Sequence, residues 1–306
     1  MCSIYKTKKI STARMPKTTK PPVNLLSAYL ILTKPGIIIG NLMVAVGAFL
    51  YASKGEIDVV AFLSLAIGTM CIIAASCIVN NYLDTDIDAH MSRTAKRPSV
   101  TRVVPLARGL LFSGTLAVVG FTVLLLGTNV LTALIGLAGA LLYTVVYTPL
   151  KHTTYLATLV GAVPGAIPPL AGFAAAQGYL DLAAWLLFAV LVAWQMPHFY
   201  AIAVFRQKDY AAASVPTIVA VKGLARTVLE MRLYIAVFVL LLLFMGLIGA
   251  VGIVSTLVLT LLGLYWLFVA LSPRSNAVTW ARKVFRVSLW VLPTLSLLLA
   301  IDGWLS

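Results

Sequence analysis

Charged residues are scarce in this chain. Only 10% of its 306 residues are Asp, Glu, Lys or Arg, and just nine are acidic. A soluble protein needs about 25% charged residues to cover its surface, whereas this chain is 61% hydrophobic and has a mean hydropathy of +1.01. Because one bilayer span takes about 20 apolar residues, the composition excludes a soluble globular protein and predicts a polytopic membrane protein of about nine helices.

Cysteine and histidine are also rare, with three of each. Cys2, Cys71 and Cys77 form no Cys-x-x-Cys pair, and two of them lie inside an apolar run. This spacing disfavours both a disulfide framework and a zinc site. The net charge of +14 invites a nucleic-acid interpretation, but in a membrane protein the positions of the charges have to be examined first.

The first 24 residues are polar and contain six basic side chains and the pair Pro21-Pro22. We predict a disordered basic tail on the cytoplasmic side, followed by a single nine-helix membrane domain at residues 25–306. A cleavable secretory signal is disfavoured, because the first apolar run begins near Leu25 and continues to Ala52. A mitochondrial presequence is a weaker alternative, since Lys outnumbers Arg in the tail.

Nine apolar runs follow the tail. They are Leu25–Ala52, Val59–Asn80, Val104–Gly127, Val130–Tyr147, Tyr155–Ala176, Leu182–Phe205, Leu233–Gly249, Ile253–Leu271 and Val284–Ile301. The least marked division separates the seventh run from the eighth, where only glycines interrupt the hydrophobic sequence. These runs predict an all-α bundle of nine transmembrane helices.

The basic residues support this count. With nine spans, every Lys and Arg except Lys54 lies on the face that carries the N-terminus. Positive residues mark the cytoplasmic side, so we predict an inner-membrane protein with its N-terminus inside and its C-terminus outside. Fusing the seventh and eighth runs would move four basic residues to the opposite face. The net charge is therefore a topology signal, and we expect no nucleic-acid partner.

Three of the nine acidic residues lie within five positions at the inner end of the second run. Steps of four along a helix place Asn80, Asp84 and Asp88 on one stripe and turn Asp86 nearly opposite. Two carboxylates one turn apart repel each other unless a cation lies between them. Mg²⁺ binds carboxylates together with substrate phosphates and retains several waters, so this stripe predicts a magnesium site.

Basic residues follow the stripe directly. Arg93, Lys96 and Arg97 can neutralise a phosphate that the metal already holds, and the whole segment therefore predicts a diphosphate site. The alternative is a solvated loop in which these acids and bases pair with one another. The asparagine on the stripe and the location at the end of a span favour the site.

Two further inner segments carry polar residues. One helical face carries His198, Ile202, Phe205 and Asp209. A histidine within a span is a functional candidate, although a histidine that only packs is an equal alternative.

The other segment leads from Tyr147 through Lys151 into a run rich in Gly and Pro. Small residues allow close helix packing, and exposed backbone there would accept a flat ligand.

These motifs resemble the membrane prenyltransferase superfamily. Asn80-x3-Asp84-x3-Asp88 with Arg93 is similar to its first metal-diphosphate motif. The segments Leu159–Pro169 and Trp194–Ala203, with Asp209-Tyr210, are similar to its haem-modifying branch, the protohaem IX farnesyltransferases or haem O synthases. The resemblance runs from Leu32-Thr33-Lys34-Pro35-Gly36 to the last span.

The resemblance implies a fold and a reaction. The fold is a nine-helix bundle around an apolar cavity open to lipid. The reaction joins the farnesyl group of farnesyl diphosphate to a vinyl group of haem B, with addition of water. Mg²⁺ is the implied cofactor, farnesyl diphosphate, haem B and the lipid bilayer are the implied partners, and proteins that deliver haem or make haem A are implied transient partners.

The resemblance also assigns site residues. Asp84, Asp88, Arg93 and Asp209 are the expected catalytic residues, with Asp84, Asp88 and Asp209 as metal ligands; substrate binding is expected from Asn80, Lys96, Arg97, Lys151, His198, Arg206 and Lys208. The second motif of the superfamily usually has two aspartates four apart, whereas Asp209 has Phe205 and Ala213 at those distances. The second metal is therefore left open, with Arg206, Lys208 or Lys222 as substitutes.

Two other functions compete with this one. A prenyltransferase acting on an aromatic quinone precursor would share the first motif, but the His198 segment and the single Asp209 argue against it. A secondary transporter would show internal repeats with broken helices and acids at mid-membrane. The chain shows no convincing repeat, and Asp84, Asp88 and Asp209 lie near the inner ends of spans.

Overall fold

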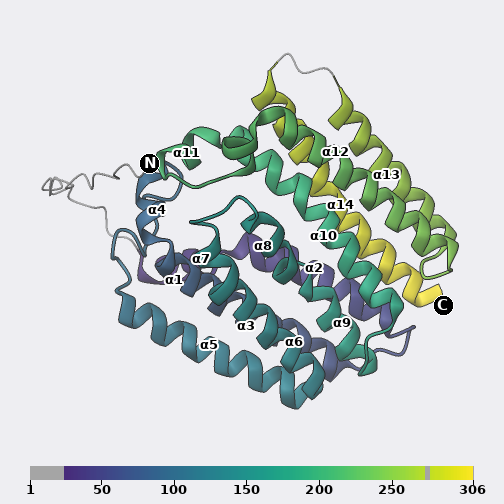
Figure 1. Cartoon of the computed structure of the whole chain (residues 1–306). Coiled ribbons are helices and arrows are strands. Elements are labelled where there is room, and N and C mark those ends of the chain that lie inside the picture. Colours follow the sequence, from purple (N-terminus) through teal and green to yellow (C-terminus); the bar gives the residue numbers. More distant parts are fainter. Residues whose placement is uncertain (1–23, 273–275, 306) are drawn as a thin grey trace, which may run out of the picture.

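The computed structural model describes residues 24–272 and 276–305, and every regular element in these ranges is a helix (Figure 1). The elements are α1 (Leu25–Thr33), α2 (Pro35–Ala52), α3 (Val59–Leu83), α4 (Thr85–His90), α5 (Leu106–Gly127), α6 (Val130–Leu141), the π-helix η1 (Leu142–Tyr147), α7 (Thr148–Leu150), α8 (Ala157–Gly165), α9 (Ile167–Gln177), α10 (Leu182–Phe205), α11 (Gln207–Ala212), α12 (Ile218–Leu247), α13 (Ile253–Leu271) and α14 (Ala277–Leu305). The predicted tail, apart from Asn24, lies outside the described residues.

Nine helical segments in the described ranges are long and apolar enough to cross a membrane. They are Pro35–Ala52, Val59–Leu83, Leu106–Gly127, Val130–Leu150, Ala157–Gln177, Leu182–Phe205, Ile218–Leu247, Ile253–Leu271 and Ala277–Leu305. The predicted all-α class and the number of spans are confirmed, and the sixth and eighth spans have the predicted bounds. The protein is an integral membrane protein, and its large exposed side chains, such as Leu126 and Leu247, are suited to lipid.

The first predicted span is not one helix. Lys34 adopts the left-handed conformation, with φ 54° and ψ 67°, and separates α1 from α2. Pro35 explains the break, because it has no N–H to donate and its ring disfavours the α conformation of the preceding residue. Only α2 belongs to the spanning set, and α1 lies beside its inner end.

The last helices begin earlier than predicted. α12 begins at Ile218 instead of Leu233, and α14 at Ala277 instead of Val284. In α12 the first turn is set off by a kink at Gly223, which has φ 78° and ψ 170°. Beyond the kink the helix is still longer than the apolar run, because hydropathy marks only the part of a helix that lies in lipid. An ion pair stabilises the added part of α12, because Arg226 Nε lies 2.8 Å from Oε1 of Glu230 one turn later.

Small residues allow the spanning helices to pack closely. α2 contacts both α9 and α14 extensively. A Cβ built on Gly47 of α2 would lie 2.8 Å from Cα of Ser296 in α14, and one on Gly172 of α9 would lie 2.3 Å from the carbonyl oxygen of Ala45. Only glycine permits these contacts, as expected for helix packing in membranes.

The Gly- and Pro-rich span is broken in its middle. Pro164 and the turn at Ala166 separate α8 from α9. Ala166 N–H donates to Val163 at 3.0 Å instead of to Ala162, and the Ala162 carbonyl accepts from Gln195 Nε2 of α10 at 2.9 Å. A side chain thus replaces the backbone bond that the break removes, which is how broken helices are tolerated in membranes.

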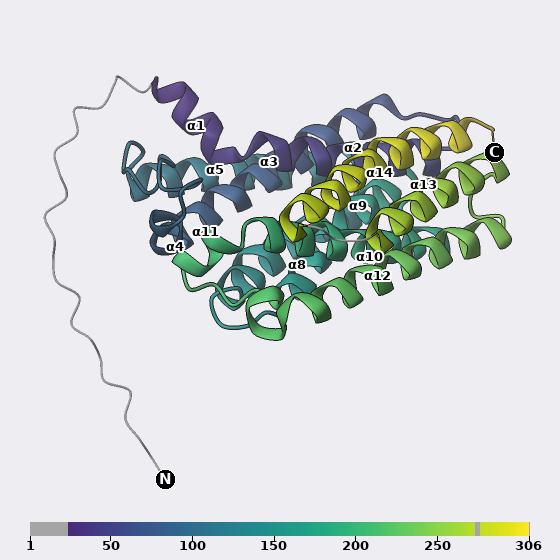
Figure 2. The same cartoon turned by 90° about the horizontal axis from the view of Figure 1, so that it is seen from above.

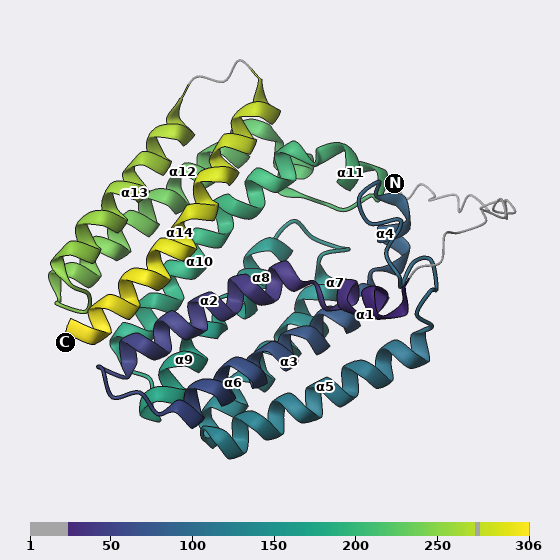
Figure 3. The same ribbon diagram turned by 180° about the vertical axis from the view of Figure 1, so that it is seen from behind.

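The short helices gather at one end of the bundle. Figures 2 and 3 show α4 and α11 together near α1, with the C-terminal end of α14 at the opposite end. Asp84, Lys151 and Asp209, which the sequence separates widely, thereby come from elements at the same end. The site is built there.

The predicted central cavity stays a prediction. Two apolar hollows of about 300 Å³ and 210 Å³ lie on outer faces of the bundle. The first is lined by Phe121 of α5 and Leu137 of α6, and the second by Ile301 and Trp304 of α14. Neither is lined by a residue of α4 or α11.

Candidate active site

The acidic stripe begins where α3 ends. Asp84 leaves the helical conformation with φ −93° and ψ 2° and is both the C-cap of α3 and the N-cap of α4. The predicted continuous helix is therefore interrupted. Asp88 N–H still donates to the Asp84 carbonyl at 2.8 Å, so the turn is preserved. Asp84 and Asp88 are both buried, with 3% of each exposed, and Asp86 is exposed, which confirms the predicted separation.

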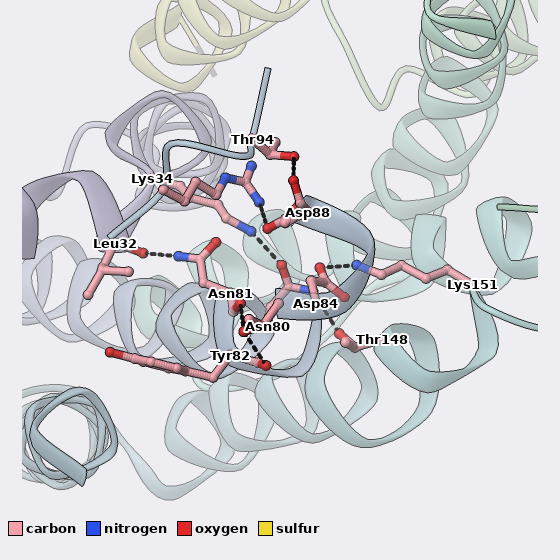
Figure 4. Close-up of polar contacts among 12 residues, drawn as sticks. Leu32, Lys34, Asn80, Asn81, Tyr82, Asp84, Asp88, Thr94, Thr148 and Lys151 are labelled. Atoms are coloured by element: carbon pink, nitrogen blue, oxygen red, sulfur yellow. Dashed lines mark hydrogen bonds and ion pairs between the residues drawn. The ribbon is translucent and has the colours of Figure 1, made fainter. Parts of the chain in front are cut away.

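Asp84 contacts two side chains that follow α7. Lys151 Nζ bonds to its Oδ2 atom, and His152 Nε2 lies 3.4 Å from its Oδ1 atom. Figure 4 shows Lys151 reaching the carboxylate across the end of α3. Oδ1 is buried and has no hydrogen-bond partner among the described residues. Burial lowers the pKa of Lys151 from its ordinary value, although Asp84 opposes this effect.

Asp88 is held by the loop after α4. Arg97 Nη1 lies 2.5 Å from Asp88 Oδ2, and Thr94 Oγ1 donates to the Asp88 carbonyl at 3.0 Å (Figure 4). Thr94 and Ser99 of this loop are buried. The loop therefore folds back over the carboxylates. Arg97 pairs with Asp88, as the alternative of paired acids and bases expects, although both side chains are largely buried, and its contact with a phosphate stays a prediction.

Asn80 joins three segments of the chain. Its Oδ1 accepts from Lys34 Nζ, and its Nδ2 donates to Thr148 Oγ1 of α7 at 3.0 Å. Asn81 next to it donates to the Leu32 carbonyl at 2.8 Å. The left-handed backbone of Lys34 is thus anchored at the site, a setting in which such strain is usually maintained by surrounding contacts.

Lys34 is the cation that the sequence reasoning did not assign to the site. Burial lowers its pKa to about 8, against opposing effects of Cys77 and Asp84. Ser92, Thr148 and His152 were likewise not predicted. The sequence pointed to Lys34 only through its place in the Leu32–Gly36 segment. Thr148 and His152 lie near Lys151 in sequence, and only the fold brings them to Asn80 and Asp84.

The two acidic segments meet at Ser92. Its hydroxyl donates to Asp209 Oδ1 at 2.7 Å, and Arg206 Nη1 lies 3.5 Å from Asp209 Oδ2. This bond joins the loop after α4 to α11. Tyr210 lies in the same region, where burial raises the pKa of its hydroxyl and the neighbouring Arg93 and Arg206 oppose that effect.

The other predicted cations are placed differently. Arg93, Lys96 and Lys208 are exposed, and no ion pair joins them to the described carboxylates. Arg93 lies near Tyr210. These side chains are exposed at the same end of the bundle as the stripe, whereas Lys34, Arg97 and Lys151 are already held beside it.

His198 is separate from the carboxylates. Its ring contacts Trp194 of α10 and Phe285 of α14, each at 4.8 Å between ring centroids, and Nδ1 lies 2.7 Å from Ser288 Oγ. The helical face expected to join it to Asp209 is interrupted, because α10 ends at Phe205 and α11 begins at Gln207. His198 therefore belongs to the contact of α10 with α14.

The carboxylates beside α4 suit Mg²⁺ only together with other ligands. The described residues contain no group of three or more His, Cys, Asp or Glu side chains that could hold a metal, so they form no protein-only cage. Mg²⁺ commonly binds one or two carboxylates and completes its shell with waters and substrate phosphates. The Oδ1 atom of Asp84, which accepts no hydrogen bond among the described residues, and the neighbouring Asp88 fit that type of site, and the adjacent cations fit a diphosphate.

Comparisons with known proteins agree with this arrangement. Residues 41–290 match the UbiA prenyltransferase family. Protoheme IX farnesyltransferase 2 of Shewanella loihica is 42% identical over 281 residues, covering 90% of this chain and 91% of the relative. Protoheme IX farnesyltransferase of Protochlamydia amoebophila is 40% identical over 283 residues, covering 91% and 99%.

Solved structures share the fold. A digeranylgeranylglyceryl phosphate synthase superposes with a TM-score of 0.75 at 17% identity, covering 92% of this chain and 99% of the other. A UbiA homolog from Archaeoglobus fulgidus bound to GPP and Mg²⁺ superposes with a TM-score of 0.69 at 15% identity, covering 87% and 99%. The family match spans most of the described helices and includes the Asn80–Asp88 stripe, Lys151 and Asp209. This chain therefore belongs to the UbiA prenyltransferase family.

Proposed function

We propose that this protein transfers the farnesyl group of farnesyl diphosphate to a vinyl group of haem B, with addition of water, to give haem O. The observation that carries the proposal is the identity of 40–42% with protoheme IX farnesyltransferases over about 90% of the chain. The carboxylates and cations beside α4 supply the chemistry that a prenyl diphosphate requires.

The diphosphate site is proposed to lie at the inner end of α3. Asp84 and Asp88 would hold Mg²⁺, and Asp209 would lie at its other side, near the Ser92 bond. When bound, Mg²⁺ would stabilise the negative charge on the departing diphosphate. Arg97 and Lys151 now pair with the buried carboxylates, and Lys34 donates to Asn80. In the complex these three cations would turn to the phosphate oxygens, which accept the same bonds.

The remaining cations are proposed to complete this site from the inner face. Arg93, Lys96, Arg206 and Lys208 are exposed and long enough to approach a bound diphosphate. Asn80 would orient Lys34 through its side-chain amide. Charges aligned before the reaction stabilise a leaving group without rearrangement during bond cleavage.

The reaction requires that water be controlled. The C1–oxygen bond of farnesyl diphosphate breaks, and diphosphate leaves with the electron pair. The terminal vinyl carbon of haem bonds to farnesyl C1, its neighbour takes a hydroxyl from water, and one proton is released. The apolar core around α2, α9 and α10 would exclude water from the allylic cation until the vinyl group has reacted.

The placement in the cell belongs to the same proposal. The protein would lie in the inner membrane with its N-terminus and the α4 and α11 end in the cytoplasm, where farnesyl diphosphate is soluble. Haem B would enter from the bilayer, and transient partners would deliver it or take haem O onward. Residues 25–306 would form one domain, and residues 1–24 a basic cytoplasmic tail.

The decisive experiment measures product mass. Purified protein in detergent or nanodiscs is incubated with haem B, farnesyl diphosphate and Mg²⁺, and the extracted porphyrin is analysed by mass spectrometry. We expect a product that carries one farnesyl group and one hydroxyl group more than haem B, absent when Mg²⁺ is chelated. Prenylation of an aromatic acid in place of haem would support the quinone-precursor alternative, and absence of both products would contradict a prenyltransferase of either kind.

A further inference from the structure

His198 is held by a buried hydroxyl. Ser288 of α14 is fully buried, and its Oγ lies 2.7 Å from His198 Nδ1. The same Oγ lies 2.6 Å from the carbonyl oxygen of Phe285. The backbone carbonyl of Ser288 accepts from Trp194 Nε1 at 3.0 Å. One residue therefore positions both the histidine and the tryptophan that stacks on it.

These distances determine where the protons lie. A carbonyl oxygen can only accept, and two oxygens at 2.6 Å repel each other unless a proton lies between them. The single Ser288 hydroxyl proton must therefore point to Phe285. Toward His198 the hydroxyl then offers only a lone pair, so Nδ1 carries the proton and donates. Neutral His198 is held as the Nδ1–H tautomer, which leaves the lone pair on Nε2.

The Nε2 atom of His198 has a free lone pair, on a ring that is partly exposed and that Phe199 also contacts, at 5.3 Å between ring centroids. Within the described residues Nε2 makes no hydrogen bond, and it is not among the buried atoms that lack a partner. Trp194 and Phe285 cover the faces of the ring, but a metal binds in the ring plane along the nitrogen lone pair. The arrangement presents an oriented, unprotonated imidazole nitrogen at membrane depth.

We propose that Ser288 is a positioning residue that holds His198 in the Nδ1–H tautomer so that Nε2 coordinates the iron of the substrate haem. This inference rests on the proposed function. Histidine ligands of metals usually donate their second N–H to an oxygen acceptor, and loss of that acceptor typically weakens metal binding 10- to 100-fold. Neutral imidazole is a common ligand of haem iron.

The other two histidines do not have this arrangement. Nδ1 of His90 lies 2.7 Å from the carbonyl of Asp86 at the exposed end of α4, and His152 faces Asp84. Both lie at the polar inner face beside carboxylates. Of the three, His198 alone lies within a spanning helix, where the hydrophobic porphyrin would be dissolved.

The test compares porphyrins with and without iron. Wild type, Ser288→Ala, Ser288→Thr and His198→Ala are titrated with ferric haem B and with metal-free protoporphyrin IX, and the Soret spectrum is recorded. Ser288→Ala should raise the Kd for haem about 10-fold and shift the Soret band, with less than about a twofold change for protoporphyrin IX. Ser288→Thr, which keeps a hydroxyl, should restore haem binding.

Ser296→Ala is the matched control. Ser296 is another buried serine of α14, and its hydroxyl has no hydrogen-bond partner among the described residues, so its loss should not alter either affinity. In the His198→Ala background, Ser288→Ala should have no further effect on haem binding, because the residue acts through the histidine.

Two results would overturn the inference. Equal weakening of both porphyrins by Ser288→Ala would show a packing role, and unchanged haem binding would show no role. Haem O formation by the wild type is measured in the same preparations. Its presence together with either result would refute only the role of Ser288, whereas its complete absence would overturn the proposed function and this inference together.

Discussion

At the scale of single residues, the site is a balance of buried charges. Asp84 and Asp88 are each 3% exposed, and a carboxylate removed from water is costly unless it is paired. Lys151 and Arg97 provide the pairing, and they come from different parts of the chain. Removing the partner of either carboxylate would therefore destabilise the fold at this end of the bundle.

Asp84→Asn and Asp88→Asn should each lower prenyl transfer about 100-fold or more, because each removes a proposed metal ligand at the developing charge. Asp86→Asn is the matched control, since Asp86 is exposed on the same helix as Asp88, and it should retain most activity. Haem O formation and thermal unfolding in detergent are measured for all three. Equal loss in the three variants would contradict the assignment.

Lys34 should limit activity at alkaline pH. Its pKa is lowered to about 8 by burial, so it is charged below that pH and neutral above it. Affinity for farnesyl diphosphate should therefore fall as the pH rises through about 8. Lys34→Arg keeps its charge to much higher pH and should move the alkaline fall in kcat/KM upward. An unchanged alkaline limb in the variant would argue against a role for this charge.

At the scale of elements, helix breaks place the site. α1 separates from α2 at Lys34, α3 from α4 at Asp84, and α10 from α11 at Arg206. The proline after Lys34 explains the first break from sequence alone. The other two lack proline or glycine, so their positions depend on tertiary bonds such as Lys151 with Asp84 and Ser92 with Asp209.

Close helix packing predicts a difference between two glycines of α2. Gly47→Ala would place its Cβ 2.8 Å from the Ser296 backbone, whereas Gly40→Ala would meet nothing within 4 Å. The first change should destabilise the protein by about 1–3 kcal/mol. The second should be neutral or stabilising by up to about 1 kcal/mol, since alanine favours helix more than glycine does.

Thermal unfolding in a mild detergent checks this pair. A clear fall in Tm is expected for Gly47→Ala, and none for Gly40→Ala. If both substitutions had the same effect on Tm, the contact between α2 and α14 would not be as close as described.

At the scale of the whole molecule, topology and charge agree. The described spans number nine, and α4 and α11 lie at one end while α14 ends at the other (Figure 2). With an odd number of spans the two ends of the domain lie on opposite sides of the membrane. All the described candidate site residues except His198 therefore share the side on which the basic residues concentrate.

Reporter fusions test this orientation. A fusion that is active only in the periplasm should be active when attached after Ser306, and a fusion active only in the cytoplasm should be active within the loop that follows α4. The positive-inside rule is the physical reason, since Lys and Arg are retained on the cytoplasmic side. A C-terminal reporter found in the cytoplasm would contradict the count of nine.

The sequence by itself determined the membrane class, the nine spans and the residues of the acidic stripe. These follow from composition and from spacings of three or four residues, which act over one helical turn and need no other part of the chain. Basic residues next in sequence to the stripe could be named in the same way, although Arg97 is paired with Asp88 and its role toward a phosphate stays a prediction.

Only the tertiary structure decided which distant side chains complete the site. Lys34 and Thr148 reach Asn80, and Ser92 reaches Asp209, across 46, 68 and 117 positions of the chain. Ser288 reaches His198 across 90. Such pairs depend on which helices pack together, and in lipid that packing follows from the fit of small residues and buried polar bonds. No local pattern records this fit, because it is a property of two surfaces that meet only after both helices have formed.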